Sequence, residues 1–258
     1  MAHGTSGKIL RIDLTQGSIH VEQFDEKFYR LYPGGKALAG YLLLKEVAPG
    51  TDPLAPENVL VIANGLLTGV PFSASTRFTV AARSPLSGGY GESEAGGFWG
   101  PELKTAGYEA FVIKGRAAQP TYISIRDDKV ELCDATQLWG REPEEVQTWI
   151  RTKHENKHTR VLQIGIGGEN LVRYAAIINE LRHFNGRSGM GAVMGSKNLK
   201  AIAVRGSART IDFMHDPKPI SDLGRVLGKR VKNHPQSWDL QVKGTPGLVG
   251  TLNAAGML

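Results

Sequence analysis

The same order of structural elements is predicted twice along this chain, and this repeat is the feature that most limits how the chain can fold. Period-two alternation indicates strands and helical spacing indicates helices, so each half shows a hairpin, a helix, a strand, a glycine loop and a strand. In the first half these elements are residues 8–21, 36–47, 59–63, 64–69 and 77–82. In the second half they are residues 121–133, 143–150, 161–164, 165–168 and 172–178, with a further strand at 201–204. Two similar halves would suit a ligand that has an approximate twofold symmetry of its own.

The character of the sequence changes near Ile211. Pro217 and Pro219 precede a helical pattern over 222–231, and the remaining residues show no apolar core of their own. We therefore predict a domain over residues 1–210, followed at 211–258 by the start of a helical element that is cut short. The composition, with 41% apolar and 22% charged residues in 258, is typical of one large globular domain and part of another.

Charge is unevenly distributed along the chain, whose net charge is +6. Residues 1–140 carry 13 basic and 15 acidic side chains, whereas residues 141–258 carry 18 and 10. The basic half is either a solvated face or the binding site of an anion such as phosphate. Nucleic acid is disfavoured as a partner, because no run of five basic residues and no aromatic–basic interleaving is present.

Cys133 is the only cysteine, so the chain is expected to hold no internal disulfide, no iron–sulfur cluster and no cysteine-ligated zinc. The first residues do not resemble a signal peptide, and the longest apolar stretches are too short to cross a membrane. We therefore expect a cytoplasmic protein without a membrane partner.

Two glycine loops resemble nucleotide-binding motifs but fail their requirements. Asn170 stands where the dinucleotide fingerprint that begins at Gly165 needs its third glycine. In the segment 191–197 a serine precedes the lysine, which is the reverse of the order in a phosphate loop. Residues 186–191 still read either as a backbone anion site, assisted by Arg187, Lys197 and Lys200, or as a glycine-rich turn with exposed cations.

Other candidate groups are less specific. Glu92, Glu94 and Glu102 flank the loop 96–100 and could serve acid–base chemistry or bind a hard cation, although surface glutamates usually do neither. His154 and His158 have helical spacing, but no third metal ligand is near them in the sequence.

Several motifs together resemble one family, the aldehyde:ferredoxin oxidoreductases that carry a tungsten or molybdenum bis-pterin cofactor. The matching segments, in order, are GKILRIDLT from Gly7, GGKALAGYLL from Gly34, GLLTG from Gly65, SPLSG from Ser84, GGFWGPELK from Gly96, GGENLVR from Gly167 and GAVMGSKNLKAI from Gly191. The resemblance extends over about residues 7–206. It implies an α+β fold in which two β-sheets, from two pseudo-repeated halves with short helices, form a base for two pterins.

The resemblance also implies where this cofactor would bind. The pterin sulfurs would hold the metal, and the positions that match cofactor contacts are Arg77, Glu94, Ala95, Gly96, Gly97, Arg182, His183, Phe184, Gly186, Arg187, Gly189 and Gly191. The backbone carbonyls of Glu94 and Phe184 match positions linked to a magnesium ion that bridges the pterin phosphates. The chain departs from the family pattern at Glu94, at His183–Asn185 and at Ser188.

The family's cluster cysteines, later pterin motifs and acid–base residues would lie beyond residue 258, so no catalytic residue is assigned. The chain is expected to be the N-terminal cofactor-binding domain of an enzyme that oxidises aldehydes to carboxylic acids and passes electrons through a 4Fe–4S cluster to ferredoxin. By itself it is expected to be inactive, with an exposed face that pairs with downstream domains or with a second copy in a homodimer. The alternative is a freestanding pterin-binding or scaffold module that works by pairing with another subunit.

Overall fold

The computed structural model describes residues 4–258, which form two compact units. The first unit contains the described residues up to His215 except Pro71–Ser73. The second contains Pro71–Ser73 and Asp216–Leu258. The first unit therefore continues past the boundary expected at residue 210, and the assignment of the second to a further domain stays a prediction.

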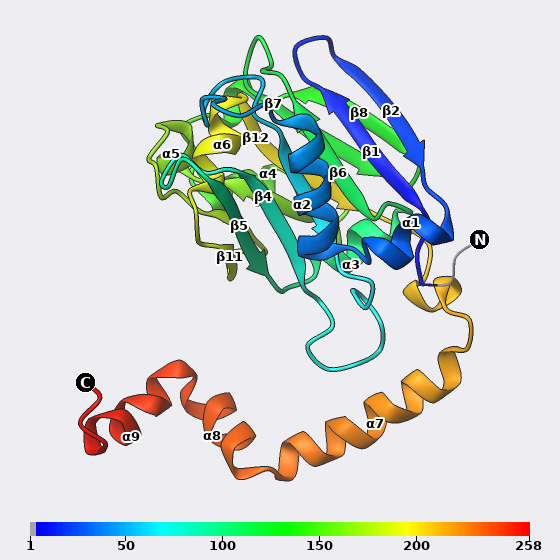
Figure 1. The fold of residues 1–258 in the computed structure, drawn as a ribbon, viewed down its shortest axis with the longest axis vertical. Helices are drawn as coiled ribbons and strands as arrows, with labels where there is room; N and C mark the ends of the chain where they lie inside the picture. Colours follow the sequence, from blue (N-terminus) through cyan, green and yellow to red (C-terminus); the bar gives the residue numbers. More distant parts are fainter. Residues whose placement is uncertain (1–3) are drawn as a thin grey trace. The chain divides into compact units, whose positions relative to one another are not determined.

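Two mixed six-stranded sheets form the first unit (Figure 1). The strands of the first sheet, in chain order, are β1 (Lys8–Asp13), β2 (Ser18–Gln23), β3 (Leu60–Asn64), β4 (Phe78–Arg83), β5 (Tyr90–Ala95) and β6 (Ala110–Lys114). Those of the second are β7 (Thr121–Arg126), β8 (Lys129–Asp134), β9 (Arg160–Ile164), β10 (Ile177–Asn179), β11 (His183–Asn185) and β12 (Leu199–Arg205). The spatial orders are β2-β1-β6-β3-β4-β5 and β8-β7-β12-β9-β10-β11. The two orders are the same once β7–β12 are matched to β1–β6.

The match extends from strand order to residue register. In both sheets the first strand pairs with the last in parallel, and the other neighbours are antiparallel. Asn64 lies opposite Phe78, which lies opposite Ala95 in the first sheet. Ile164 lies opposite Ile177, which lies opposite Asn185 in the second. The repeat predicted from the sequence is thus confirmed, together with the α+β class, and each strand residue in one half can be assigned an equivalent in the other.

Helices cover both outer faces of the sheets and fill the space between them. The helices of the first unit are α1 (Glu26–Leu31), α2 (Gly35–Glu46), α3 (Trp99–Thr105), α4 (Pro143–Lys153), α5 (Ile166–Glu169) and α6 (Met190–Ser196), with 3-10 turns η1 (Thr136–Leu138) and η2 (Thr210–Phe213). Helix α2 packs on the outer face of the first sheet and α4 on that of the second. Helices α3 and α6 lie between the sheets, where they join the largest apolar cluster.

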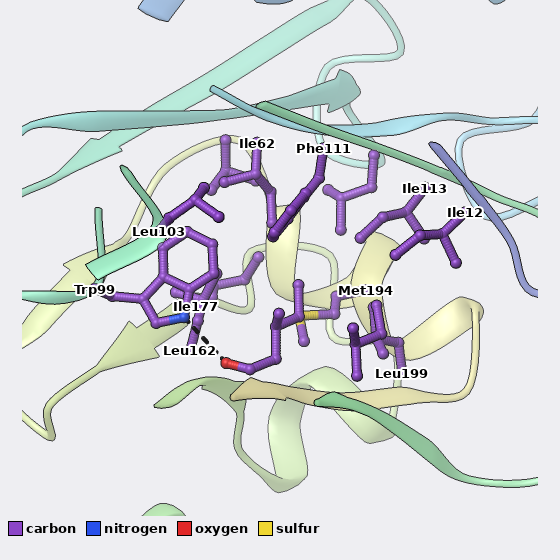
Figure 2. Close-up of a cluster of buried hydrophobic side chains, with 14 of the residues drawn as sticks. Ile12, Ile62, Trp99, Leu103, Phe111, Ile113, Leu162, Ile177, Met194 and Leu199 are labelled. Carbon is purple, nitrogen blue, oxygen red and sulfur yellow. Dashed lines mark hydrogen bonds between the residues drawn. The ribbon is translucent and has the colours of Figure 1, made fainter. Parts of the chain in front are cut away.

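The core between the sheets joins the two halves. Figure 2 shows Trp99 and Leu103 of α3 beside residues of both sheets, with Met194 of α6 in the same cluster. The buried Trp99 indole N–H donates to the Ile202 carbonyl of β12 over 3.0 Å. This hydrogen bond satisfies the one polar atom of a fully buried ring, so the ring adds apolar contact without a desolvation penalty. The halves are therefore a single packed body and not two separable lobes.

The second unit is largely helical. It contains α7 (Pro217–Asn233), α8 (Pro235–Lys243), the 3-10 turn η3 (Thr245–Gly247) and α9 (Leu248–Ala254). The Asp216 side chain caps α7 by accepting from the backbone N–H of Lys218, and Pro217 occupies the first turn, where a missing N–H costs nothing. The helical pattern expected over 222–231 is confirmed within the longer α7.

One sequence expectation about the strands was wrong. Only Ile177 and Ile178 of the strand predicted over 172–178 lie in a strand, β10, and residues 172–176 contain a turn at 173–174 and no regular structure. The segment leaves the ladder because the Ala175 carbonyl accepts the backbone N–H of Gly191, at the start of α6. This segment therefore hydrogen-bonds to the start of α6 instead of extending β10.

Candidate functional site

The two segments that the sequence singled out lie side by side in the fold. Strand β5 is at the edge of the first sheet and β11 is at the edge of the second, and the two edges are in contact. Side chains join them: the Asn179 amide donates to the Gly96 carbonyl over 3.2 Å, and the Asn185 amide donates to the Ser93 carbonyl over 2.8 Å. The backbone N–H of Arg187 donates to the Ser93 hydroxyl over 3.1 Å. The segments 94–97 and 182–187 therefore share one side of the domain.

The register makes two residues of these segments equivalent. Glu94 lies opposite Thr79 in the first sheet, and Phe184 lies opposite Ile178 at the corresponding step of the second. A ligand that approaches both edges would therefore meet these two residues in similar backbone settings. Their side chains differ: Glu94 is exposed and charged, whereas Phe184 is apolar and 55% exposed.

Gly97 has no room for a side chain. Its φ of 97° lies in the region that favours glycine, and a Cβ atom there would meet the Asn179 Oδ1 atom and, at 2.6 Å, the His183 ring. The first loop and β11 can approach this closely only because Gly97 carries no side chain. A larger residue would push the two candidate segments apart.

Gly189 has the same role at the second loop. Its φ is 71°, and a Cβ would meet the Arg173 carbonyl and, at 2.9 Å, the Pro85 ring. Gly189 and Gly191 are both buried, and the Gly191 N–H is already bonded to Ala175. Gly189 and Gly191 therefore pack against the interior of the domain, whereas Gly186 and the exposed residues beside it form the outer surface of the loop.

Four arginines around the two segments have no partner among the residues that the structure describes. Arg77, Arg173, Arg182 and Arg187 are exposed, and within the described residues none forms an ion pair or a side-chain hydrogen bond. Most other arginines of the described chain are paired; Arg151 and Arg160, for example, both contact Glu180 at 2.9 Å. Unpaired guanidinium groups are suited to bind phosphate or carboxylate in a bidentate manner.

Arg77 belongs to this region through the register of the first sheet. It directly precedes Phe78, which lies opposite Ala95, so its backbone is beside Gly96. The Arg77 carbonyl accepts the Thr68 hydroxyl over 2.5 Å, which fixes the backbone and leaves the guanidinium unengaged. Arg173 was not predicted from the sequence; its place against Gly189 brings it to the second loop.

Lys36 offsets the acidic charge of β5. Its ammonium group lies 2.8 Å from a Glu92 carboxylate oxygen and 3.6 Å from a Glu94 oxygen. The hydrogen bond to Glu92, with the charge of Glu94, raises the pKa of Lys36. The two carboxylates therefore leave less net negative charge at the edge where an anion would bind, and a role for them as an acid–base pair is not favoured by this arrangement.

Lys197 and Lys200, which the sequence suggested as contacts to an anion, are instead buried structural groups. The Lys197 ammonium donates to the carbonyls of Pro56, Asn58 and Gly115, and burial lowers its pKa to about 8. The Lys200 ammonium is paired with Glu169 at full burial. The expectation was wrong because both amines find acceptors far away in sequence, which no local pattern reveals.

The remaining charged candidates are also structural. Glu102 contacts Arg205 at 2.7 Å and accepts the Gly206 N–H. His154 is buried against the Tyr122 hydroxyl at 3.3 Å, and this burial lowers its pKa. Among the residues that the structure describes, no group of three or more His, Cys, Asp or Glu side chains is placed to hold a metal ion. In the same part of the chain no helix is both long and apolar enough to cross a membrane.

Comparison with known proteins agrees with this architecture. Residues 9–206 match the model of the family described as aldehyde ferredoxin oxidoreductase, N-terminal domain. The chain belongs to this family. A tungsten-containing aldehyde ferredoxin oxidoreductase of Pyrococcus furiosus is 42% identical over 256 residues, which are 99% of this chain and 42% of that protein. The chain thus spans less than half the length of this relative.

Other relatives carry different names. An aliphatic sulfonate oxidoreductase, WOR-like subunit, of Pyrococcus furiosus is 39% identical over 88% of this chain and 38% of its own length. Among solved structures, the active-site complex BamBC of benzoyl coenzyme A reductase with 1,5-dienoyl-CoA matches with a TM-score of 0.86 and 36% identity. That match covers 92% of this chain and 36% of the other. The same domain therefore occurs in proteins named for chemically different substrates.

Proposed function

We propose that this chain is the part of a tungsten- or molybdenum-pterin oxidoreductase that binds the bis-pterin cofactor. The observation that carries the proposal is the meeting of two equivalent backbone segments, 94–97 and 182–187, among four arginines without protein partners. Two pterins that share one metal ion present two phosphate groups, and a pseudo-repeated surface with unpaired cations fits such a ligand. The tungsten-containing relatives support a tungsten pterin.

Specific residues are proposed for each part of the cofactor. Arg77 and Arg187, with Arg182, would contact phosphate or pterin oxygens through their guanidinium groups. The backbone carbonyls of Glu94 and Phe184 would supply oxygen ligands to a magnesium ion, since hard cations prefer oxygen. Ala95, Gly96, Gly97, His183 and Gly186 would line the surface between them.

The reaction belongs to the whole protein. With the cofactor in place, the whole protein would convert an aldehyde and water to a carboxylic acid, two protons and two electrons, and a cluster carried elsewhere would pass the electrons to ferredoxin. The chain by itself is proposed to be inactive, since its part is to bind and orient the cofactor. Because the relatives are named for an aldehyde, a sulfonate and a coenzyme A ester, we propose that this domain holds the cofactor and that other regions select the substrate.

A second candidate is a cofactor-binding module that works by pairing with another subunit. The match to a protein of the BamBC complex favours it. A groove along α2 also lacks a cover within the described residues; its lining is partly apolar and includes two lysines (Leu31, Tyr32, Lys36, Ala37, Gly40, Tyr41, Leu44 and Lys45). The equivalent helix α4 carries Glu144 and Glu145 in its first turn and is amphipathic, as expected of a helix that faces water.

The first test of the proposal is a titration with inorganic phosphate in the presence of Mg²⁺, followed by backbone amide chemical shifts. Amides in 94–97 and 182–187 should shift together and saturate. Arg187→Gln should weaken the binding, whereas Arg30→Gln, which removes an exposed cation paired with Glu26 on α1, should not. Shifts that are absent, or that occur only elsewhere, would exclude the anion site.

The second test asks whether the anion is a pterin. The chain would be purified from cells grown with tungstate, oxidised to convert bound pterin to its fluorescent form, and assayed for pterin and tungsten per chain. We expect pterin in wild type and its loss in Arg77→Gln/Arg187→Gln. A phosphate response without any bound pterin would reject the bis-pterin assignment.

A further inference from the structure

Two buried asparagines of the second half hold the backbone of the first loop. Asn179 on β10 and Asn185 on β11 are both fully buried. Their side-chain amides donate across the contact between the halves, to the carbonyls of Gly96 and Ser93. The two accepting carbonyls are located on either side of Glu94 and Ala95. The short segment proposed to face the cofactor is therefore held at both ends by the other half.

The repeat provides an internal comparison for these two positions. The register makes Val80 the equivalent of Asn179 and Ala95 the equivalent of Asn185. Both equivalents are apolar and buried, so this strand framework does not need an amide at either position. In addition, the Oδ1 atom of each asparagine is buried without a hydrogen-bond partner. A buried unpaired carbonyl lowers stability, so each amide carries a cost that its donated hydrogen bonds must offset; for Asn179 these include one to the His183 carbonyl over 3.3 Å within its own half.

Other contacts already join the two segments. The Arg187 N–H bonds the Ser93 hydroxyl, and the Ser188 hydroxyl donates to the Glu92 carbonyl over 3.2 Å. These bonds lie on one side of Glu94, whereas the Asn179 bond to Gly96 lies on the other. Asn179 thus adds a constraint at the far end of the intervening backbone, and Asn185 adds a further bond at the near end, at Ser93.

We propose that Asn179 and Asn185 are positioning residues that set the separation between the Glu94 and Phe184 backbones for the cofactor's cation. They do not touch the ligand. They act through the carbonyls of Ser93 and Gly96, as groups beyond the immediate ligands orient a metal site. This inference rests on the proposed function, because the separation matters only if a shared ligand bridges the two segments.

The test compares the variants Asn179→Val and Asn185→Ala, singly and together, with Gln163→Ala. These substitutions install the residue found at the equivalent position of the other half. Gln163 is a matched control: it is fully buried, donates to the Pro143 carbonyl over 2.9 Å within its own half, has an unpartnered Oε1, and is equivalent to Ala63. Thermal unfolding identifies any variant that does not fold, and the single variants then replace the double.

Two readouts are used on the full 258-residue chain. Amide hydrogen exchange reports the constraint on residues 93–97 without any ligand. Mn²⁺ in phosphate buffer is the probe of the cation site, because bound Mn²⁺ broadens nearby amide signals in both segments. We expect faster exchange over 93–97 and roughly 10–100-fold weaker Mn²⁺ binding in the asparagine variants, the range typical of residues that orient metal ligands. Gln163→Ala should change neither.

The outcomes separate the inference from the function on which it rests. If wild type binds Mn²⁺ at both segments and the variants bind it equally well, the asparagines are structural and the inference is wrong. Unchanged exchange over 93–97 also overturns it, whatever the metal does. If wild type binds no Mn²⁺ at these segments, the proposed cation site fails and the inference fails with it.

Discussion

Substitution of Gly97 by alanine tests whether the close approach of the two loops is built into the fold. Two costs are expected. An L-residue held at positive φ costs about 1–2 kcal/mol. A Cβ forced against the fully buried Asn179 Oδ1 and the half-buried His183 ring adds about 1–3 kcal/mol of overpacking. The two costs sum to a loss of about 2–5 kcal/mol in the free energy of unfolding, with about 3 kcal/mol as a central value.

Two control glycines separate these costs. Gly88 has a φ of 72° with nothing near its would-be Cβ, so Gly88→Ala measures the backbone cost alone. Gly186 has neither a positive φ nor a neighbour closer than 3.9 Å, so Gly186→Ala should be almost neutral. Urea unfolding followed by circular dichroism gives all three values. For a unit of this size, 3 kcal/mol corresponds to a fall in Tm of roughly 6–12 °C.

The comparison of Gly97→Ala with Gly88→Ala decides whether the lack of space beside Gly97 adds to the backbone cost. If both variants lose the same free energy, the space beside Gly97 is larger than the structure shows, and the argument for an enforced close approach is refuted. If Gly97→Ala loses more, the same variant should also weaken phosphate binding in the titration described above, because the two segments have moved apart.

Three further outcomes are expected. Burial lowers the pKa of Lys197 to about 8 from its ordinary 10.5, so between pH 8 and pH 10.5 the unfolded chain binds more protons than the folded chain. The free energy of unfolding should therefore rise with pH across this range, by up to about 3 kcal/mol. In Lys197→Met, the free energy of unfolding measured against pH should rise less steeply. Lys200→Met should destabilise the chain by about 3–5 kcal/mol in urea, because Glu169 is left as an uncompensated buried charge; a loss below 1 kcal/mol would contradict this. Leu44, which is 89% exposed on the α2 groove, should promote self-association, so Leu44→Lys should lower the apparent mass in concentration-dependent sedimentation; a wild-type chain that stays monomeric would contradict this.

The order of elements could be predicted from sequence because it depends on local patterns. The β1–β2 and β7–β8 hairpins alternate along their length, and α2 and α4 show helical spacing. Strand β5 was missed because its outer face carries Glu92 and Glu94 and its inner face is formed by small residues. Helix α3 was missed because it starts with Trp99-Gly100-Pro101, where glycine and proline hide the helical pattern.

The composition of the site could be predicted only in part. Motifs located the two loops, and the fold places them together. The sequence does not show which lysine and arginine side chains remain unpaired, because their hydrogen-bond acceptors lie far away in the chain. Lys197 bonds a carbonyl 139 residues away and is used by the core, whereas Arg187 in the same glycine-rich stretch stays unengaged. The basic character of the second half is compatible with the proposed anion site, but two of the cations suggested for it, Lys197 and Lys200, are buried structural groups.

The residues that distinguish the two halves are as informative as the framework they share. Strand order and register are the same, so the backbone offers a ligand two similar edges. The differences lie at equivalent positions. Glu94, which contacts Lys36, is equivalent to the apolar Phe184. Asn179 and Asn185 are equivalent to the apolar Val80 and Ala95. A repeat suits the proposed two-pterin ligand, but the shared framework alone does not fix the distance between the two edges. In our proposal, the Asn179 and Asn185 amides, which occur in only one half, fix this distance. Substitution of these two residues therefore tests the proposed cation site more sharply than disruption of the strand framework that both halves share.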